Sequence, residues 1–207
     1  MKRYLIGAGG HATVIESISK KGGNVKLDGV FCDNKEDNLT HLEWIGSFDE
    51  IYNNIDGNEF MIAFGDINER IKLIEKLNNY NIKWMPAMID ETAIVAPDVS
   101  VKIEEGTVVM PGAIINAGAK IGKHVIVNSG AIIEHGCVIN DYCHISPSAT
   151  ICGNTVVGKG SWLGANSTVI NALTIGEGVI VGAGTVVLKN IDDNLTIVGA
   201  PSRVLKK

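Results

Sequence analysis

The stretch "IGKHVIVNSGAIIEHGCVIN", residues 121–140, decides the fold because its aliphatic residues recur at every sixth position. The period extends over fifteen positions, and every one holds isoleucine, valine or leucine. They are Ile103, Val109, Ile115, Ile121, Val127, Ile133, Ile139, Ile145, Ile151, Val157, Leu163, Val169, Ile175, Val181 and Val187. A six-residue period rich in glycine and β-branched residues does not match the 3.6-residue face of a helix. It is the hexapeptide signature of a parallel β-helix.

A second inward position follows four residues after each aliphatic one, and it mostly holds a small residue. The small residues are Thr107, Ala113, Ala119, Ala131, Cys137, Cys143, Ala149, Thr155, Ser161, Ser167 and Thr185. Glycine follows the aliphatic position at five corners, where we expect backbone angles that other residues avoid. These glycines are Gly122, Gly158, Gly164, Gly176 and Gly182. Because three hexads make one triangular coil, the sequence predicts five coils, with an irregular coil before them at residues 93–102.

Residues 1–88 follow a different pattern, in which apolar strands alternate with amphipathic helices. We expect strands at residues 3–7, 25–33 and 59–65 and a helix at residues 11–21. A second helix follows Asp66, which stands three residues before Glu69 as in a capping box. This order predicts a small, Rossmann-like parallel sheet in an α/β domain over residues 1–88. The β-helix, with a short C-terminal tail, then forms a second domain over residues 89–207.

Composition and charge favour a protein that acts on small molecules. The chain of 207 residues has a formal charge of −5 and no cluster of Lys and Arg, so neither a nucleic-acid surface nor a membrane surface is predicted. The apolar run after Met1 is too short for a signal peptide, and no stretch approaches a membrane span. We therefore expect a cytoplasmic protein. Its four cysteines lack a CxxC pair and fit a reducing compartment as small core residues.

The order of motifs along the chain resembles the sugar O-/N-acyltransferases of the NeuD and PglD type. The motifs are "LIGAGGHA", "GVFCDN", "IAFGDINER", "NSGAIIEHGCVINDYCHISPSATICGN" and "GAPSRV". The resemblance covers almost the whole chain. It implies a left-handed β-helix, acetyl-CoA as co-substrate, and an acceptor sugar that is often nucleotide-linked. It also implies a homotrimer whose active sites lie between subunits.

The resemblance implies that His135 is the general base of the transfer. His135 stands two residues after the inward Ile133, at neither inward position, so we expect its side chain to project from the coil. Histidine suits proton transfer near neutral pH. In many members of the family an acidic residue follows the base, whereas Gly136 stands here. Glu134, Asp141 or a backbone carbonyl are the candidates for orienting His135, and the alternative is a surface histidine without a role.

The residues implied to bind acetyl-CoA are His144, Gly153, Ala165 and Ala183. A pantetheine arm could lie along the stacked backbone groups at small corner residues, although such residues are also common at corners without a ligand. Lys189, Arg203, Lys206 and Lys207 lie near the end where the CoA phosphates would sit, but tail lysines are usually only solvated. His124 has no counterpart in the family, and we expect it to lie in solvent.

The N-terminal "GAGGHA" is a G-x-G-x-x-A motif between a strand and a helix, where backbone can approach a phosphate. Asp33, at the end of the second strand, would suit a ribose hydroxyl. The domain is short for a complete dinucleotide fold, and the resembling family uses it for the sugar nucleotide. We therefore expect a nucleotide sugar rather than NAD, bound by Gly9, Gly10, His11, Asp33, Asn34 and Gly65.

The preferred function is acetyl transfer to the amine of a UDP-linked 4-amino sugar in bacterial surface glycan or glycoprotein synthesis. The alternatives are O-acetylation of a sialic acid, a zinc-dependent carbonic anhydrase on the same scaffold, and a non-catalytic assembly scaffold. Zinc catalysis needs converging histidines. The spacings of His124, His135 and His144, eleven and nine residues, do not match the close histidine pair of those anhydrases, so no metal is expected.

Overall fold

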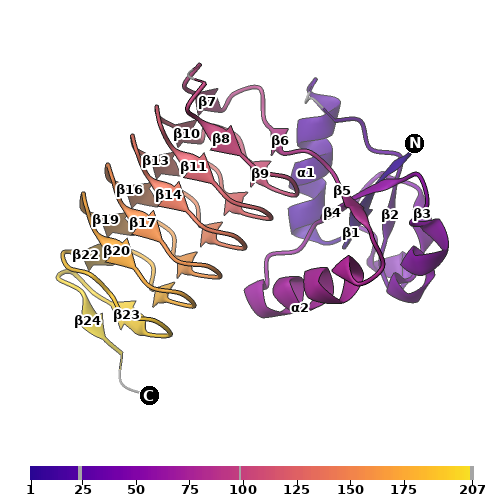
Figure 1. The fold of residues 1–207 in the computed structure, drawn as a ribbon. Helices are drawn as coiled ribbons and strands as arrows, with labels where there is room; N and C mark the ends of the chain where they lie inside the picture. The colour runs from indigo at the N-terminus through magenta and orange to yellow at the C-terminus, as the bar shows by residue number, and fades with distance from the viewer. Residues whose placement is uncertain (23–24, 98, 206–207) are drawn as a thin grey trace.

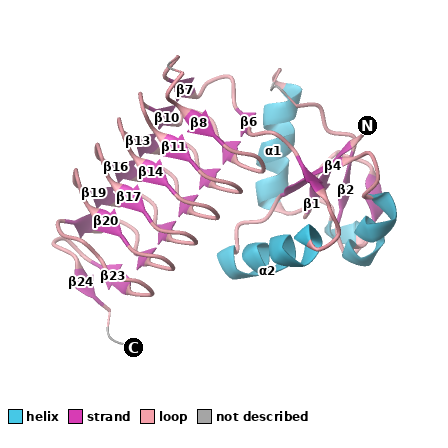
Figure 2. Ribbon diagram, in the orientation of Figure 1, coloured by secondary structure: helices cyan, strands magenta, loops and turns pink. Residues whose placement is uncertain are grey.

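The computed structural model describes residues 1–22, 25–97 and 99–205, and it contains an α/β part followed by a β-helix (Figures 1 and 2). The β-helix is left-handed, as the resemblance implies. Asp98 of the predicted irregular coil and the tail residues Lys206 and Lys207 lie outside the described residues. No helix in the described ranges is long and apolar enough to cross a membrane.

The α/β part is a five-stranded parallel sheet with helices on both faces. Its strand order is β3-β2-β1-β4-β5. The strands are β1 (Arg3–Ile6), β2 (Gly29–Phe31), β3 (Trp44–Gly46), β4 (Glu59–Ile62) and β5 (Lys83–Trp84). The helices are α1 (Gly10–Lys20), α2 (Ile67–Asn78) and the short 3₁₀ segments η1 (Lys35–Asp37) and η2 (Phe48–Asn54). The helix α1 packs on one face of the sheet, and α2 and η2 pack on the other.

The predicted strands and helices are present, with differences in length. The strand predicted at residues 25–33 shortens to Gly29–Phe31, and the sequence did not predict the short strands β3 and β5. Asp66 begins α2 as expected, because its carboxylate accepts hydrogen bonds from the backbone N–H groups of Asn68 and Glu69. The last strand of the α/β sheet ends at Trp84, and the β-helix begins with β6 at Met88. The independence of the two parts as domains stays a prediction.

The β-helix has three parallel sheets, here called sheets I, II and III. Sheet I consists of β6 (Met88–Ile89), β9 (Val108–Val109), β12 (Ile126–Val127), β15 (His144–Ile145), β18 (Trp162–Leu163), β21 (Ile180–Val181), β23 (Thr196–Val198) and β24 (Arg203–Val204). Sheet II consists of β7 (Ile94–Val95), β10 (Ile114–Ile115), β13 (Ile132–Ile133), β16 (Thr150–Ile151), β19 (Thr168–Val169) and β22 (Val186–Val187). Sheet III consists of β8 (Lys102–Ile103), β11 (Lys120–Ile121), β14 (Val138–Ile139), β17 (Val156–Val157) and β20 (Thr174–Ile175). Only β24 runs antiparallel to its neighbour, β23, among these described strands.

The aliphatic repeat forms the core of the β-helix, as the sequence predicts. Every one of its positions is buried except Ile103, which is half-buried. The small residues of the second inward position are buried as well, and most of their hydroxyls bond to neighbouring coils, whereas the buried Ser167 Oγ has no hydrogen-bond partner among the described residues. Thr107 Oγ1 donates to the Gly122 carbonyl at 2.7 Å, and Ser161 Oγ donates to the Gly176 carbonyl at 2.7 Å. Thr107 and Ser161 therefore avoid the penalty of an unpaired buried polar group.

The five corner glycines have a different role from the one expected. They do not lie in the left-handed region, which is occupied two residues further along each corner, for example by Asn166 with φ 56°. Their reason is close approach between coils. A Cβ on Gly158 would lie 2.4 Å from the carbonyl carbon and oxygen of Gly176, and one on Gly164 would lie 2.6 Å from the backbone nitrogen of Ala183. Only glycine fits at this spacing.

Sheet I of the β-helix carries the α/β part. Residues of α1 share one buried cluster with Met88, Val108 and Ile126, whose side chains point outward from sheet I. In Figure 1, α1 lies between the five-stranded sheet and the first coils, and α2 lies below it beside the coils. The outer surface of sheet I is therefore covered over its first coils, and His144, Trp162 and Ile180 continue the same row beyond Ile126.

Replacing a close-approach glycine should destabilise the β-helix. Gly158→Ala should lower the free energy of unfolding by about 2 kcal/mol, because the new methyl group overlaps the backbone of the next coil. The control is Gly112→Asn. Gly112 has φ 68° and a Cβ there would meet nothing closer than 4.0 Å, so asparagine, which tolerates this conformation, should cost less than about 1 kcal/mol. Urea unfolding at fixed protein concentration measures both, and equal losses would contradict this role for Gly158.

Candidate functional site

A cavity of about 580 Å³ opens at the carboxyl ends of the strands of the α/β sheet. This edge of a parallel α/β sheet is where ligands usually bind. The cavity is lined by Gly7, Ala8, Gly9, Cys32, Asp33, Asp37, Phe48, Phe64, Glu69, Lys72, Leu73 and Lys76. Of the residues expected to bind the nucleotide sugar, Gly9 and Asp33 are in this lining.

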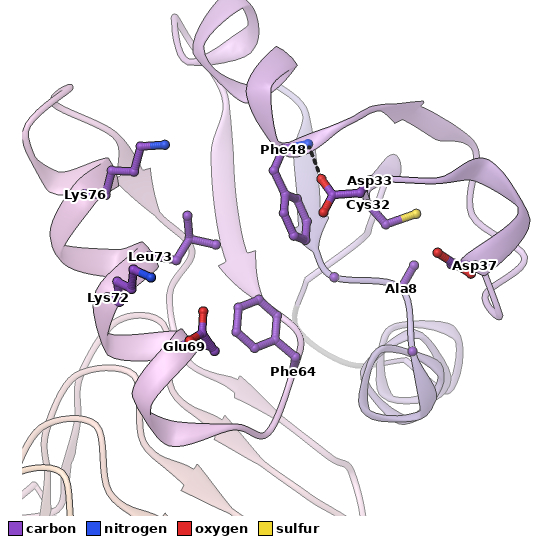
Figure 3. A pocket seen from close by; sticks show the side chains of 12 residues that line it. Ala8, Cys32, Asp33, Asp37, Phe48, Phe64, Glu69, Lys72, Leu73 and Lys76 are labelled. Carbon is purple, nitrogen blue, oxygen red and sulfur yellow. Dashed lines mark hydrogen bonds between the residues drawn. The ribbon is translucent and has the colours of Figure 1, made fainter.

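The cavity combines carboxylates, aromatic rings and ammonium groups (Figure 3). Asp33 follows β2, and its Oδ1 accepts a hydrogen bond of 3.4 Å from the backbone N–H of Phe48. Lys72 and Lys76 come from α2 on the side opposite Asp33 and Asp37. Carboxylates accept hydrogen bonds from hydroxyl groups, and ammonium groups bind phosphates. This arrangement fits a ligand with a sugar hydroxyl at one end and an anionic group at the other.

His11 and Gly65 lie at a second place, against sheet I of the β-helix. A Cβ on Gly65 would lie 3.8 Å from Cε1 of His144, and the His144 ring forms a hydrogen bond with the Gly65 backbone. His11, in the first turn of α1, is close enough to His144 for a charge on His144 to lower the pKa of His11. The predicted substrate set therefore divides between the cavity and the seam that joins the α/β part to the β-helix. The remaining two residues of the set, Gly10 and Asn34, are exposed, and they directly follow the cavity residues Gly9 and Asp33.

Neighbouring groups fix both ring nitrogens of His144. The side-chain amide nitrogen of Asn128 lies 3.2 Å from His144 Nε2, while Asn128 Oδ1 accepts from the backbone N–H of Ser129 at 2.8 Å. The amide must therefore donate to Nε2, which places the ring proton on Nδ1 and directs it to the Gly65 carbonyl. The ring also stacks on Trp162 at 5.9 Å with an interplanar angle of 16°. Sequence reasoning did not identify Asn128 or Trp162, which the β-helix brings next to His144.

Arg70 lies beneath this group of side chains. It is buried on α2, and its Nη2 donates to the carbonyls of Tyr142 at 2.6 Å and Cys143 at 3.4 Å. Burial, and after it the positive charge of Arg70, lowers the pKa of His144 to about 4 and that of His11 to about 4. Both rings are thus neutral at physiological pH. Arg70 was not predicted, but its position three residues after Ile67 and four before Ile74, on the apolar face of α2, was a signal.

His124 does not lie in solvent as expected. It is 3% exposed, stands edge-on to Trp84 at 4.6 Å and stacks on Tyr142 at 5.7 Å. Burial lowers its pKa to about 3, with smaller contributions from Arg70 and Lys123. The prediction failed because β5 of the α/β part covers the corner on which His124 stands. This contact between distant parts of the chain has no counterpart in the repeat pattern.

His135 projects from the β-helix, as its place in the hexad predicts. It is exposed at the corner between sheets II and III, which faces away from sheet I and from the α/β part. Its ring lies over Gly153 of the next coil, where a Cβ would come within 2.6 Å of Cε1 and Nε2. The Glu134 carboxylate accepts from the backbone N–H of His135 at 3.2 Å, and the Asp141 carboxylate accepts from the backbone N–H of Lys123. Gly136 has φ 66°, which favours glycine at this turn.

The residues implied to bind acetyl-CoA lie at three places on one chain. His144 lies on sheet I, Gly153 lies under His135, and Ala165 and Ala183 stack at the corner between sheets I and II. The Gly184 N–H donates to the Ala165 carbonyl at 2.8 Å, which sets the spacing of these two corners. One chain therefore does not bring His135 and His144 together. Within the described ranges, no group of three or more His, Cys, Asp or Glu side chains is placed to hold a metal ion.

Comparisons with known proteins agree with this architecture. Residues 2–77 match the model of the PglD N-terminal domain, and residues 100–135, 118–153 and 154–189 match the bacterial transferase hexapeptide model of six repeats. The acetyltransferase domain of PglB from Neisseria gonorrhoeae is 30% identical, with a TM-score of 0.88 and 99% of each chain covered. PerB from Caulobacter crescentus, solved with CoA and GDP-perosamine, is 29% identical, with a TM-score of 0.90. The match covers 100% of this chain and 98% of PerB.

The parallel α/β sheet, the hexapeptide β-helix and these full-length similarities define a class of protein. The chain belongs to the NeuD/PglD-type family of hexapeptide-repeat sugar acyltransferases. The predicted resemblance is confirmed, and so is the assignment to acetyl-CoA-dependent sugar acetyltransferases.

The buried histidines should make the protein less stable in mild acid. The pKa values of His11, His124 and His144 lie well below the value of about 6.5 for an unfolded chain. The unfolded state therefore binds more protons below that pH, and the free energy of unfolding should fall as the pH drops from 6.5 towards 4. His124→Asn should reduce this slope by up to about 1.4 kcal/mol per pH unit.

Urea unfolding at several pH values measures the slope. The control is His41→Asn, which removes a largely exposed histidine and should keep the wild-type slope. A His124→Asn protein with the full wild-type slope would show that His124 takes up its proton as easily in the folded protein as in the unfolded chain.

Proposed function

We propose that the protein transfers the acetyl group of acetyl-CoA to the amine of a nucleotide-linked amino sugar. The observation that carries this proposal is the exposed His135 ring over Gly153, on the scaffold of a sugar acetyltransferase that also has a nucleotide-sized cavity. The solved PerB structure contains CoA and GDP-perosamine, an amino sugar on a nucleotide. The preferred acceptor here is a UDP-linked 4-amino sugar.

His135 is the proposed general base. Its ring takes a proton from the acceptor amine while the amine nitrogen bonds to the thioester carbonyl carbon. The carbon–sulfur bond then breaks, and His135 passes the proton to the leaving sulfur, so that CoA leaves as its thiol. Glu134 orients His135 through the backbone, because its carboxylate holds the His135 N–H at the turn. Gly153 leaves space for the imidazole.

The α/β cavity is the proposed site of the nucleotide. Asp33 and Asn34 would bind the ribose, and Gly9 and Gly10, before α1, would approach the diphosphate. The acceptor sugar would then extend towards His11, Gly65 and His144 at the seam. His144, Ala165 and Ala183 would contact acetyl-CoA.

A second copy of the chain completes this site in the proposal. His135 and His144 lie on opposite sides of one β-helix, so a sugar held at the seam cannot reach the His135 of its own chain. The homotrimer expected for the family places the His135 corner of one chain against sheet I of its neighbour. Sheet II offers a half-exposed aliphatic row with Ile114, Ile132 and Val186 for contact between copies.

The amine is preferred over a hydroxyl because no acidic residue follows His135. Gly136 stands there, and Glu134 and Asp141 bond to backbone N–H groups rather than to the imidazole. A modest base is sufficient for an amine, which is the stronger nucleophile. O-acetylation of a sialic acid is the second candidate.

Replacing the base should remove turnover without removing binding. His135→Ala should lower kcat by roughly two to four orders of magnitude and leave acetyl-CoA affinity nearly unchanged. His144→Ala should instead weaken acetyl-CoA binding. Release of free thiol from acetyl-CoA measures turnover, and calorimetry measures binding. Near-normal kcat in His135→Ala would exclude His135 as the base.

The same thiol assay identifies the acceptor. We expect turnover with UDP-linked and GDP-linked 4-amino sugars, with the UDP sugar preferred, and none with free sialic acid or CMP-sialic acid. Turnover only with the sialic acids would support the second candidate. Lack of turnover with every acceptor would favour a non-catalytic scaffold.

A further inference from the structure

Arg70 connects the α/β part to the strand that carries His144. Its side chain is 2% exposed and crosses from α2 to the corner before β15, where Nη2 donates to the carbonyls of Tyr142 and Cys143. Cys143 is the residue directly before His144. The guanidinium therefore holds the backbone at the point where the His144 ring leaves the coil.

The same end of α2 also holds the His144 ring. Gly65 precedes Asp66, the residue that caps α2, and its carbonyl accepts from the His144 ring. Arg70 lies one turn into this helix. Two contacts from one rigid helix end, one to the ring and one to the adjacent backbone, fix the position of His144.

The charge of Arg70 acts in the same direction as these contacts. A positive charge close to an imidazole disfavours the second proton. It helps to hold the pKa of His144 near 4, and the charged groups around that ring are Arg70 and the titratable His11. A neutral His144 can accept the Asn128 amide at Nε2, whereas a protonated ring could not.

We propose that Arg70 is a positioning residue for acetyl transfer, which fixes His144 in one orientation and one tautomer through the Tyr142–Cys143 corner. This inference rests on the proposed function, because His144 is assigned there to the acetyl-CoA site. The competing explanation is that Arg70 only strengthens the seam. That explanation predicts a loss of stability with no change in the state of His144.

The variants Arg70→Met and Arg70→Lys separate these explanations. Methionine keeps an apolar stem but removes the charge and both hydrogen bonds, and lysine keeps the charge with a single ammonium. The control is Arg3→Met, which removes the Arg3–Glu59 ion pair, 2.7 Å long, at the amino end of the α/β sheet. Each protein is labelled with ¹⁵N-histidine, and the His144 signal is assigned by its loss in His144→Asn.

Nitrogen chemical shifts report the His144 tautomer, and thiol release gives kcat and KM. In the wild type and in Arg3→Met we expect the Nδ1–H tautomer and normal turnover. In Arg70→Met we expect a mixture of tautomers at pH 7 and a loss of about 100-fold in kcat/KM, since a small displacement of a positioned group has effects of this size. Arg70→Lys should recover the Nδ1–H tautomer only in part, because one ammonium does not reproduce both hydrogen bonds, and it should recover about tenfold of the lost activity.

An unchanged His144 tautomer in Arg70→Met would overturn the proposal, whatever happens to turnover. If Arg70→Met does not fold, an Arg70→Lys protein with altered His144 shifts and reduced kcat/KM supports the proposal, and one identical to wild type overturns it. If the wild type acetylates no acceptor, the proposed function fails, but the tautomer comparison still decides whether Arg70 orients His144.

Discussion

The register between coils is the constraint on which the rest of the structure depends. Each coil adds one strand to each sheet, so His144 pairs with Trp162 and Trp162 pairs with Ile180 along one face. Aliphatic side chains fill the interior, and glycines such as Gly158 allow neighbouring corners to approach. Because this register is rigid, residues a whole coil apart lie side by side, whereas residues half a coil apart, such as His135 and His144, lie on opposite sides. The separation of the two histidines thus follows directly from the repeat.

The sequence was sufficient to predict the β-helix, because the six-residue period is a local property that every coil repeats. It also predicted the direction of His135, since the hexad decides which side chains point outward. The seam was not predictable in the same way. His124 and Arg70 are buried there by segments far away in the chain, and their surroundings depend on how the α/β part sits on sheet I. The role of the corner glycines was also not predicted, because it depends on the distance between neighbouring coils, which the sequence of a single coil does not give.

The seam gives the polar residues of the candidate site a defined state. In the unfolded chain, water surrounds each histidine ring, and each ring can be protonated in mild acid. In the folded protein the same rings lie beside a buried arginine and stay neutral. Folding removes that freedom, and the Asn128 amide and Gly65 carbonyl then select one His144 tautomer. His135 has a different environment, because it is exposed on the opposite corner over Gly153. In the proposed function, one chain supplies an ordered half-site at the seam and an open half-site at the corner.

We propose that two copies of the chain combine these half-sites into one active site. Mixed trimers, purified through two different tags from cells that express His135→Ala and His144→Ala chains together, test this arrangement. In a mixed trimer, one of the three sites receives His135 from a His144→Ala chain and His144 from a His135→Ala chain. We therefore predict that roughly a third of wild-type turnover returns. The assay is made at low acetyl-CoA, where each parent is nearly inactive. Mixed trimers as inactive as their parents would contradict the account, because they would show that both histidines must belong to the same chain.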